Sequence, residues 1–397
     1  MEPEQKETLK KKKKNVLIIC PFFRPNIGGV ETHLDRLIEY LGKNDYYSIV
    51  LTYQPLASKT KGARREYGEN FEVHRLQWFG TGLFEQLETK FPLVFTYVFP
   101  GLFIKSMLFY MVNHKHIDVI HAHGLVAATI GLFCKLFVNK RMVVSTHAIY
   151  SFENRKRLLK LLVAGILFFY DKILAVSEVS KQELIKIGLP ARKIEAFRNW
   201  VDTDVFKPRD RQKLSITSDK KINFLMISRF IEKKGVLLYL KAAEKIKEAN
   251  FYLVGAGQLQ HEVDSLVSKS ANVEYMGILN QSDPKQCSTM LDLYSLADYF
   301  VSPYLYDEGY SITLCESVAS GTVPVIPERG SPPTFLTKEV AHYMPAVINE
   351  EILINTLQGL LSHPKDEDSI KNCREYALKY LGFSNAKIIT DAYKEDE

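Results

Sequence analysis

The stretch that decides how this chain is organised reads DEGYSITLCE at residues 307–316, followed by SVASGTVPVI at residues 317–326. The pattern predicts a loop, a short helix and a strand, with Glu308 in the loop and Glu316 further along the helix. Eight helical residues span about 12 Å, whereas two carboxylates that jointly cleave a glycosidic bond lie about 5 to 9.5 Å apart. The helix N-terminus between them suits a phosphate. The stretch therefore indicates an extended ligand, with a sugar hydroxyl at Glu308, a ribose at Glu316 and a diphosphate between.

Length and charge bound the class of protein. The 397 residues, of which 46% are hydrophobic, suffice for two domains with separate cores. The net charge of +6 favours anionic partners such as nucleotides, pyrophosphates or an anionic membrane surface. Much of the excess lies in the lysine run at residues 10–14, which we assign to a disordered tail spanning residues 1–14. The run lacks interleaved aromatic residues, which argues against nucleic-acid binding.

Cysteine usage and hydropathy give expectations about the compartment. The five cysteines are scattered without disulfide or metal-ligand spacing, and a reducing, cytoplasmic compartment fits this usage. The N-terminal residues do not follow the plan of a signal peptide. The apolar stretch at residues 92–112 is interrupted by Pro100, Gly101 and Lys105. We therefore expect two interfacial or buried helical pieces there rather than a membrane-crossing helix.

Strand-like and helix-like segments alternate along the chain, which predicts parallel sheets covered by helices. In the first part, strands are expected at residues 16–20, 48–53, 73–76, 118–121, 142–146, 172–176 and 194–197, with helices from 30 onward and at 125–137 and 155–169. In the second part, strands are expected at 222–227, 251–254, 273–276 and 299–302, with helices at 236–249 and 290–297. The polar stretch 207–221 between the two parts is interpreted as a linker.

Two motifs of the first part lie where strands end. Gly28 and Gly29, between the first strand and its helix, allow the backbone to approach a phosphate, although a plain tight turn is the alternative. His121 and His123 share one face of their strand, and His147 ends the next strand. Two interpretations stay open for each histidine, namely a contact with a ligand or a structural role. We find no further ligand at zinc-like spacing, so no metal site is predicted.

Two motifs of the second part follow its first two strands. Arg229 and Lys234 in SRFIEKKG (228–235) can converge on a diphosphate, with a solvated charged loop as the alternative. The VGAG stretch at 254–257 lacks the remaining features of a dinucleotide fingerprint. We therefore expect a tight turn near a nucleotide base rather than an NAD site.

In this order and spacing, the motifs resemble the retaining glycosyltransferases of family 4, which have the GT-B architecture. The resemblance covers nearly everything after the basic tail and also rests on ILAVSE (173–178), residues 199–206, LAD (296–298) and Gly321 after Glu316. It implies an α/β protein with two Rossmann-like domains whose parallel sheets face across a cleft. The expected domains are an N-terminal acceptor domain at 15–206, rejoined by a C-terminal helix at 383–397, and a donor domain at 222–382.

The resemblance also implies a role for each motif residue. Arg229 and Lys234 would neutralise the leaving diphosphate, Glu308 would contact the transferred sugar with His123 beside it, and Glu316 would hold the ribose. The implied catalytic set is His123, Arg229, Lys234 and Glu308. The implied donor-binding set is Gly28, Gly29, Arg229, Lys234, Glu308, Gly309, Ser311, Ile312, Thr313 and Glu316. Acceptor contacts would fall to Glu31 and His147, with no metal and no cofactor.

The implied activity is transfer of a hexose from a UDP- or GDP-sugar to an acceptor hydroxyl, with retention. The apolar stretch at 92–112, the basic helix near 155–160 and the lysine tail suit an anionic bilayer, so we expect a lipid-linked or membrane-associated acceptor. Ordinary core helices are the alternative. The expected location is cytoplasmic, peripheral on the inner face of the membrane. A nucleotide-sugar epimerase, a soluble-acceptor synthase and a non-catalytic GT-B subunit stay open, and Ser311, which departs from the family pattern, leaves the donor sugar open.

Overall fold

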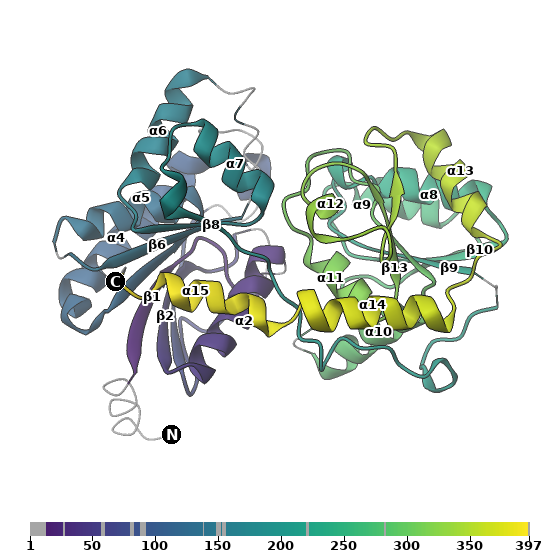
Figure 1. Ribbon diagram of the computed structural model, residues 1–397, viewed down its shortest axis with the longest axis horizontal. Helices are drawn as coiled ribbons and strands as arrows, with labels where there is room; N and C mark the ends of the chain where they lie inside the picture. The colour runs from purple at the N-terminus through teal and green to yellow at the C-terminus, as the bar shows by residue number, and fades with distance from the viewer. Residues whose placement is uncertain are drawn as a thin grey trace. The chain divides into compact units, whose positions relative to one another are not determined.

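The computed structural model describes residues 13–26, 28–56, 60–79, 83–87, 93–137, 139–147, 152, 156–219, 222–281 and 283–395. The chain forms two compact units, Met1–Asn199 with Ala386–Glu397, and Trp200–Asn385. Each unit is a mostly parallel sheet covered by helices on both faces (Figure 1). The prediction of two parallel-sheet α/β domains is therefore confirmed.

The first unit is built on an eight-stranded sheet in the order β3-β4-β2-β1-β5-β6-β7-β8, parallel except for the β3–β4 pair. Its strands are β1 (Lys14–Ile19), β2 (Tyr46–Tyr53), β3 (Arg65–Tyr67), β4 (Phe71–Leu76), β5 (Val119–His123), β6 (Arg141–Thr146), β7 (Lys172–Ala175) and β8 (Ile194–Ala196). The central strands are buried on both faces, as their unbroken apolar runs indicate. Of the strands of this unit, only the short antiparallel β3 was not predicted. Residues 1–12 of the expected tail lie outside the described residues, and Lys14 already belongs to β1.

Helices cover both faces of this sheet. They are α2 (Gly29–Lys43), α3 (Leu83–Leu87), α4 (Leu93–Asn113), α5 (Gly124–Lys135), α6 (Arg157–Phe168), α7 (Glu178–Lys186) and α15 (Lys387–Ala392), with short 3₁₀ turns at His114–His116 and Ala191–Lys193. Leu17 and Ile19 of β1 belong to the core that α4, α5 and α6 cover. The helices α4, α5 and α6 gather on one side of the sheet in Figure 1, and α2 and α15 lie on the other.

The prediction of two helical pieces at residues 92–112 is wrong, because α4 is one helix that contains Pro100. The Tyr53 hydroxyl explains this continuity. It accepts a hydrogen bond from the Leu102 N–H at 2.6 Å and donates to the Val98 carbonyl at 2.7 Å, so it bridges the two groups that a regular helix would join directly. By length and composition, residues 93–116 are the one candidate membrane span among the described residues, and 39% of its most apolar window is buried inside the unit.

Replacing Tyr53 by phenylalanine should destabilise the protein by about 2 kcal/mol or more, because two buried backbone groups of α4 lose their partner. Tyr110 provides a matched control on the same helix. It is fully buried, and its hydroxyl has no hydrogen-bond partner among the described residues. Tyr110→Phe should therefore be neutral or stabilising. Urea unfolding of both variants checks the prediction, and equal effects would contradict it.

The second unit has a six-stranded parallel sheet in the order β11-β10-β9-β12-β13-β14. Its strands are β9 (Ile222–Ile227), β10 (Ala249–Val254), β11 (Val273–Tyr275), β12 (Tyr299–Val301), β13 (Val323–Pro327) and β14 (His342–Met344). Its helices are α8 (Val236–Lys245), α9 (Gln260–Val267), α10 (Pro284–Leu296), α11 (Ile312–Ala319), α12 (Pro332–Phe335), α13 (Glu350–Leu360) and α14 (Glu367–Tyr380), with 3₁₀ turns at Arg211–Lys213, Glu232–Lys234 and Phe383–Ala386. The helices α8, α9 and α13 cover one face and α10, α11 and α14 the other (Figure 1).

The segment 207–219, whose composition predicted a linker, lies in the second unit. Its charges form ion pairs with groups at and just beyond the end of α10. Arg209 pairs with Asp292 at 2.7 Å, and Arg211 pairs with the fully buried Asp298 at 2.8 Å. The charged residues of this segment therefore form specific ion pairs with Asp292 of α10 and with Asp298, which directly precedes β12.

Candidate active site

Each sheet has a switch point, where successive strands stop adding on one side of the first strand and begin adding on its other side. In the second unit, β10 and β11 lie on one side of β9, and β12, β13 and β14 lie on the other. In the first unit, β2 and β4 lie on one side of β1, and β5 to β8 lie on the other. Doubly wound sheets bind ligands at such a switch point, beyond the carboxyl ends of the strands. The loops that follow β1, β5, β9 and β12 hold most of the predicted site residues.

Lys234, Glu308 and Tyr306 meet at the switch point of the second unit. The Lys234 Nζ lies 2.5 Å from Glu308 Oε2, and the Tyr306 hydroxyl donates to the same oxygen at 2.6 Å. The Lys234 ammonium also lies 5.2 Å from the centre of the Tyr306 ring. Burial and the neighbouring Glu308 carboxylate raise the pKa of Tyr306, so its hydroxyl stays protonated, while the charge of Arg229 acts in the opposite direction. Three cations, Lys233, Lys234 and Arg229, and one carboxylate are therefore gathered around one tyrosine.

Glycines let these loops approach one another closely. Gly235 has φ 73°, and a Cβ there would lie 2.1 Å from the Pro303 carbonyl oxygen. Gly330, with φ 69°, would place a Cβ 2.6 Å from the Glu308 backbone nitrogen. A side chain at Gly235 would push apart the loops that carry Lys234 and Glu308, and one at Gly330 would displace the loop that carries Glu308. The backbone contacts at Gly235 and Gly330 therefore hold the two loops in place.

The glycines of the VGAG stretch pack against the loop that carries Arg229. A Cβ on Gly255 would lie 1.9 Å from the Ser228 carbonyl oxygen, and one on Gly257 would lie 2.5 Å from the Phe230 carbonyl oxygen. The Phe230 N–H also donates to the Ala256 carbonyl at 2.8 Å. These contacts support the neighbouring loop, and the expected tight turn near a nucleotide base stays a prediction.

Glu316 is buried on α11, where both carboxylate oxygens accept hydrogen bonds. Oε1 accepts from the Gln281 side chain at 3.0 Å, and Oε2 accepts from the Tyr294 hydroxyl at 2.9 Å. The predicted donor-binding residues Gly309, Ser311, Ile312 and Thr313 lie at the start of the same helix. Ser311 Oγ lies 3.0 Å from Thr313 Oγ1 and does not cap the helix.

The glycine pair of the first unit begins α2. Gly28 is the N-cap residue, and a Cβ on it would lie 2.6 Å from Glu31 Oε2, so this predicted acceptor-contacting carboxylate folds back over the turn. A Cβ on Gly29 would meet nothing within 4 Å. The first turn of an α-helix presents backbone N–H groups that lack intrahelical partners, which suits an anionic or hydroxyl ligand. Ile27, within this motif, lies outside the described residues.

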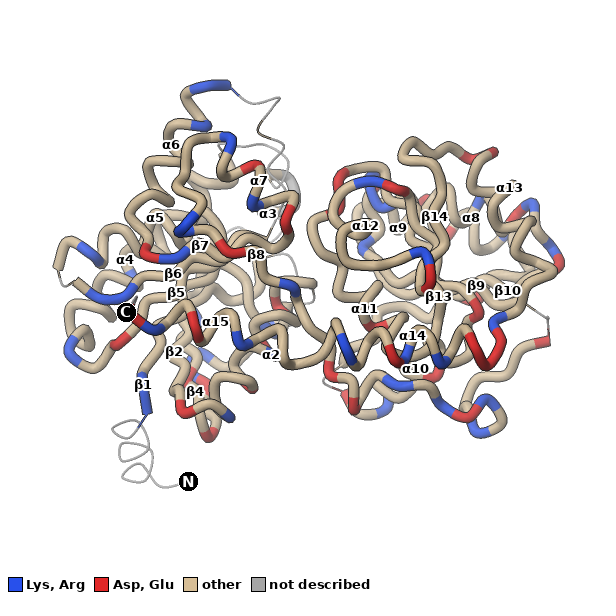
Figure 2. The backbone as a smooth tube through the Cα atoms, viewed as in Figure 1, with Lys and Arg blue, Asp and Glu red and all other residues tan. Residues whose placement is uncertain are grey.

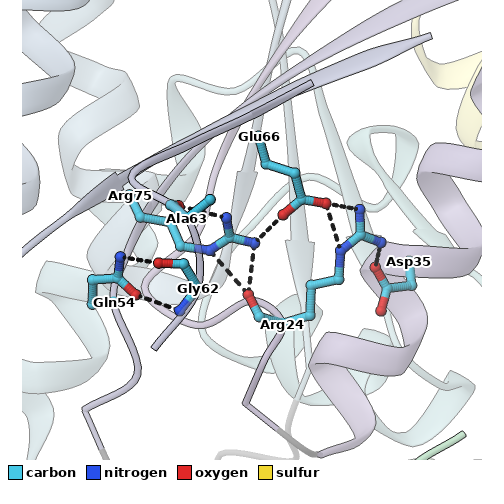
Figure 3. A network of polar contacts seen from close by, with 7 residues as sticks. All are labelled: Arg24, Asp35, Gln54, Gly62, Ala63, Glu66 and Arg75. Atoms are coloured by element: carbon cyan, nitrogen blue, oxygen red, sulfur yellow. Dashed lines mark hydrogen bonds and ion pairs between the residues drawn. The ribbon is translucent and has the colours of Figure 1, made fainter. Parts of the chain in front are cut away.

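A polar network holds the loop between β1 and α2 (Figure 3). Arg24 of this loop pairs with Asp35 of α2 and with Glu66 of β3, the latter at 2.6 Å. Arg75 of β4 donates to the Arg24 carbonyl at 2.9 Å and to Glu66 at 2.7 Å. The two arginines thus share one carboxylate, which lowers the pKa of Glu66 against the effect of burial. The loop that leads to Gly28 is anchored through both its backbone and its side chain.

Four histidines gather at the switch point of the first unit. His121 is fully paired, since its ring nitrogens lie 2.6 Å from the Tyr393 hydroxyl and 2.8 Å from Ser145 Oγ. His123 Nδ1 lies 2.9 Å from His147 Nε2. The His33 ring of α2 lies 5.0 Å from that of His147 and 5.7 Å from that of His123. Burial lowers the pKa of His147 to about 4 and that of His33 and His123 well below 6.5, so these imidazoles are neutral at pH 7.

The structure divides the predicted residues into two groups. Gly28, Gly29, Glu31, His123 and His147 belong to the first unit, and the remaining predicted residues belong to the second. Sequence reasoning missed His33, Tyr306, Gln281 and Tyr294 as neighbours of these groups. A signal existed for His33, which follows the glycine pair on the buried side of an amphipathic helix. The other three make contacts that follow from the packing of loops and helices rather than from any local pattern.

Two family models match the chain. The model described as Glycosyltransferase Family 4 matches residues 27–205, and the model described as Glycosyl transferases group 1 matches residues 221–363. The chain belongs to glycosyltransferase family 4. The prediction of an enzyme of this family is confirmed, and the chain is a retaining glycosyltransferase that takes its sugar from a nucleoside diphosphate sugar.

Relatives of this family 4 glycosyltransferase include subunits of one named enzyme. The chain is 24% identical over 343 residues to the phosphatidylinositol N-acetylglucosaminyltransferase GPI3 subunit of Saccharomyces cerevisiae, covering 83% of this chain and 71% of that protein. It is 21% identical over 375 residues to the phosphatidylinositol N-acetylglucosaminyltransferase gpi3 subunit of Schizosaccharomyces pombe, covering 87% of this chain and 72% of that protein.

Solved structures support the GT-B fold of the glycosyltransferase. Sucrose-phosphate synthase of Thermosynechococcus elongatus superposes with a TM-score of 0.78 at 18% identity, covering 96% of this chain and 98% of that one. The HepE protein of Anabaena, in complex with UDP-glucose, superposes with a TM-score of 0.73 at 16% identity, covering 95% of this chain and 98% of that one.

Proposed function

We propose that the second unit of this glycosyltransferase binds a UDP-sugar and that Lys234 is the principal group that stabilises the leaving diphosphate. The observation that carries the proposal is the convergence of Lys234, Glu308 and Tyr306 at the switch point, next to the start of α11. A diphosphate there would meet the ammonium of Lys234, the exposed guanidinium of Arg229 and the N–H groups of the first helical turn.

Each residue then has a physical task in the transfer. As the bond from the anomeric carbon to the diphosphate lengthens, negative charge grows on the diphosphate oxygens, and Lys234 with Arg229 stabilises it electrostatically. Glu308, held by Lys234 and Tyr306, would accept hydrogen bonds from hydroxyls of the transferred sugar. Glu316, fixed by Gln281 and Tyr294, would accept hydrogen bonds from the ribose hydroxyls. We propose that this donor reaction is metal-independent.

The first unit would hold the acceptor and one side of the sugar. His123 and His147 are neutral imidazoles, so each can donate one hydrogen bond and accept another without a buried charge. We assign His123 to the transferred sugar, and His147 and Glu31 to the acceptor. Because both named relatives act on phosphatidylinositol, we propose an inositol phospholipid or another lipid-linked alcohol as acceptor, with UDP-N-acetylglucosamine as the first donor to test.

An apolar, basic surface on the first unit supports a lipid acceptor. The helices α4, α5 and α6 pack side by side. Their large exposed apolar residues include Leu108, Met111 and Val112 of α4, Phe133 of α5, and Leu158, Leu161, Leu162 and Phe168 of α6. Every charged residue on these three helices is Lys or Arg (Figure 2). An apolar layer with only positive charges suits the surface of an anionic bilayer. We propose that this surface holds the enzyme peripherally on the cytoplasmic side of a membrane.

Replacing both Leu161 and Leu162 by glutamate should abolish flotation of the protein with phosphatidylinositol-containing liposomes at low salt. These residues are 57% and 56% exposed, so the fold should tolerate the change, while two negative charges would oppose insertion into an anionic surface. Leu378→Glu is the matched control, because Leu378 is 53% exposed on α14 of the other unit. Absence of flotation by the wild-type chain, or equal flotation by all variants, would contradict the proposed membrane contact.

Two measurements test the proposed function separately. UDP-sugars should raise the Tm of the chain more than GDP-sugars do, and Glu316→Gln should weaken that shift. Sugar transfer from UDP-N-acetylglucosamine to phosphatidylinositol vesicles, followed by mass spectrometry of the lipid, tests the acceptor. A Tm unaffected by any nucleotide would contradict the donor site. Transfer to a soluble alcohol but to no lipid would contradict the proposed acceptor while leaving the donor site intact.

A further inference from the structure

The edge strand β3 contacts the loop that joins β1 to α2, although β4 and β2 separate β3 from β1 in the sheet. Glu66 of β3 makes this contact. Its Oε1 accepts hydrogen bonds from Arg24 of the loop, at 3.2 Å from Nε and 2.6 Å from Nη2 (Figure 3). From this contact we infer that Arg24 and Glu66 are positioning residues, which hold the first turn of α2 and its Glu31 in place for the acceptor. The inference rests on the acceptor contact proposed for Glu31.

Arg24 joins three parts of the unit through separate nitrogens of one guanidinium group. Nε and Nη2 bind Glu66 at the sheet edge, whereas Nη1 pairs with Asp35 of α2. Asp35 lies one turn after Glu31, on the same face of the helix. The Arg24 side chain therefore ties the start of α2 to β3. A lysine ammonium is a single point charge, so a lysine at this position could not reproduce both contacts in the same geometry.

Arg75 of β4 fixes the backbone of the same loop. Its Nε and Nη2 donate to the Arg24 carbonyl at 3.1 and 2.9 Å, and Nη2 also donates to Glu66 Oε2 at 2.7 Å. The Arg75 side chain is 1% exposed, and a buried charge is costly unless it is paired. Arg24 is thus held at its carbonyl as well as at its guanidinium, and both arginines share Glu66.

The segment that leads into β3 is also held in place. Gln54, which follows β2, donates from Nε2 to the Gly62 carbonyl at 2.8 Å, and its Oε1 accepts from the Gly62 N–H at 2.9 Å. Arg75 Nη1 donates to the neighbouring Ala63 carbonyl at 3.0 Å. A Cβ on Gly62 would lie 2.8 Å from Arg75 Nε, so a side chain there would displace the arginine. Glu66 therefore meets Arg24 from an edge strand whose own position is fixed.

The ion pairs of Arg24 should affect the site more than they affect the stability of the fold. The side chains of Arg24, Asp35 and Glu66 are 29% to 32% exposed, and partly exposed ion pairs contribute little to the free energy of unfolding. They nevertheless connect the loop to both the helix and the sheet edge. A displacement of about 1 Å at a reacting site can cost about a hundredfold in rate. We therefore expect loss of these pairs to raise the KM for the acceptor and to change the Tm only slightly.

Steady-state kinetics of Glu66→Gln and Arg24→Lys test the inference, with UDP-N-acetylglucosamine and phosphatidylinositol vesicles as substrates. Each variant should raise the KM for the lipid by at least about tenfold. The Kd for UDP should not change, because the proposed donor site lies in the other unit. Glu195→Gln is the matched control. Glu195 lies on β8 at the opposite edge of the same sheet, where its side chain is 36% exposed and pairs with Lys172 at 3.0 Å. Its substitution should leave the KM for the lipid unchanged.

Hydrogen–deuterium exchange tests the same inference without sugar transfer. The backbone amides of residues 20–26 should exchange at least about tenfold faster in Glu66→Gln than in the wild-type chain, because the loop opens more often. Glu195→Gln should leave their exchange unchanged. A normal KM for the lipid in both Glu66→Gln and Arg24→Lys, or equal exchange in Glu66→Gln and Glu195→Gln, would overturn the inference. Failure of the wild-type chain to modify any lipid would contradict the proposed acceptor alone, and the exchange rates would then decide whether the pair positions the loop.

Discussion

Replacing Lys234 by alanine should lower the turnover number of sugar transfer by at least about a hundredfold, which corresponds to about 3 kcal/mol of lost transition-state stabilisation. The ammonium of Lys234 lies at the switch point of its sheet, 2.5 Å from Glu308, and is held against the ring of Tyr306. Its charge is therefore fixed in place before the leaving diphosphate develops negative charge. Pre-placed charge of this kind acts mainly on the transition state.

Lys233→Ala is the matched control for Lys234→Ala. Lys233 is the exposed neighbour in the same turn, and its ammonium lies 5.0 Å from the centre of the same Tyr306 ring. The substitution removes an equal charge from the same loop without removing the contact to Glu308, so we expect a change within about threefold, the size of a screened surface interaction. Steady-state kinetics, with donor binding measured in parallel, would distinguish the effects of the two substitutions. Near-normal turnover in Lys234→Ala, or equal losses in both variants, would refute the assignment.

Replacing Gly235 by alanine should destabilise the second unit by more than about 3 kcal/mol and should also lower turnover in the protein that remains folded. The new Cβ would lie 2.1 Å from the Pro303 carbonyl oxygen, at a backbone φ of 73° that disfavours side chains. Relief of this contact must separate the turn that carries Lys234 from the loop that carries Glu308. A displacement of about 1 Å at such a site can cost about a hundredfold in rate.

Gly277→Ala separates the effect of backbone strain from the effect of the clash. Gly277 lies in the same unit with φ 69°, but a Cβ there would meet nothing within 4 Å. The free energy of unfolding of this variant should fall by only about 1–2 kcal/mol, which is the cost of a left-handed residue with a side chain. Its turnover per folded molecule should stay normal. Urea unfolding and kinetics at low temperature measure both quantities. Equal stability losses in the two variants would show that the contact with Pro303 is not significant.

Much of the fold followed from local patterns. The strands were predicted, except β3 and β14, because parallel strands buried on both faces require continuous runs of apolar residues. The alternation of these strands with helices led to two α/β domains, and the motif at 307–326 gave the loop, α11 and β13 in the correct order. The charged segment at 207–219 shows the limit of composition, because ion pairs with Asp292 and Asp298 place it in the second unit.

The sequence by itself determined which residue types stand at the carboxyl ends of the strands, and through them the family and its chemistry. Only the tertiary structure decided which of them meet. Lys234 and Glu308 are 74 residues apart and come together because β9 and β12 are adjacent in the sheet. The Tyr53 hydroxyl completes α4 from 49 residues away, and His33 joins His123 and His147 across three elements. Strand order and helix packing set these long-range contacts, whereas local periodicity reports only whether a segment is buried and in which direction its side chains alternate.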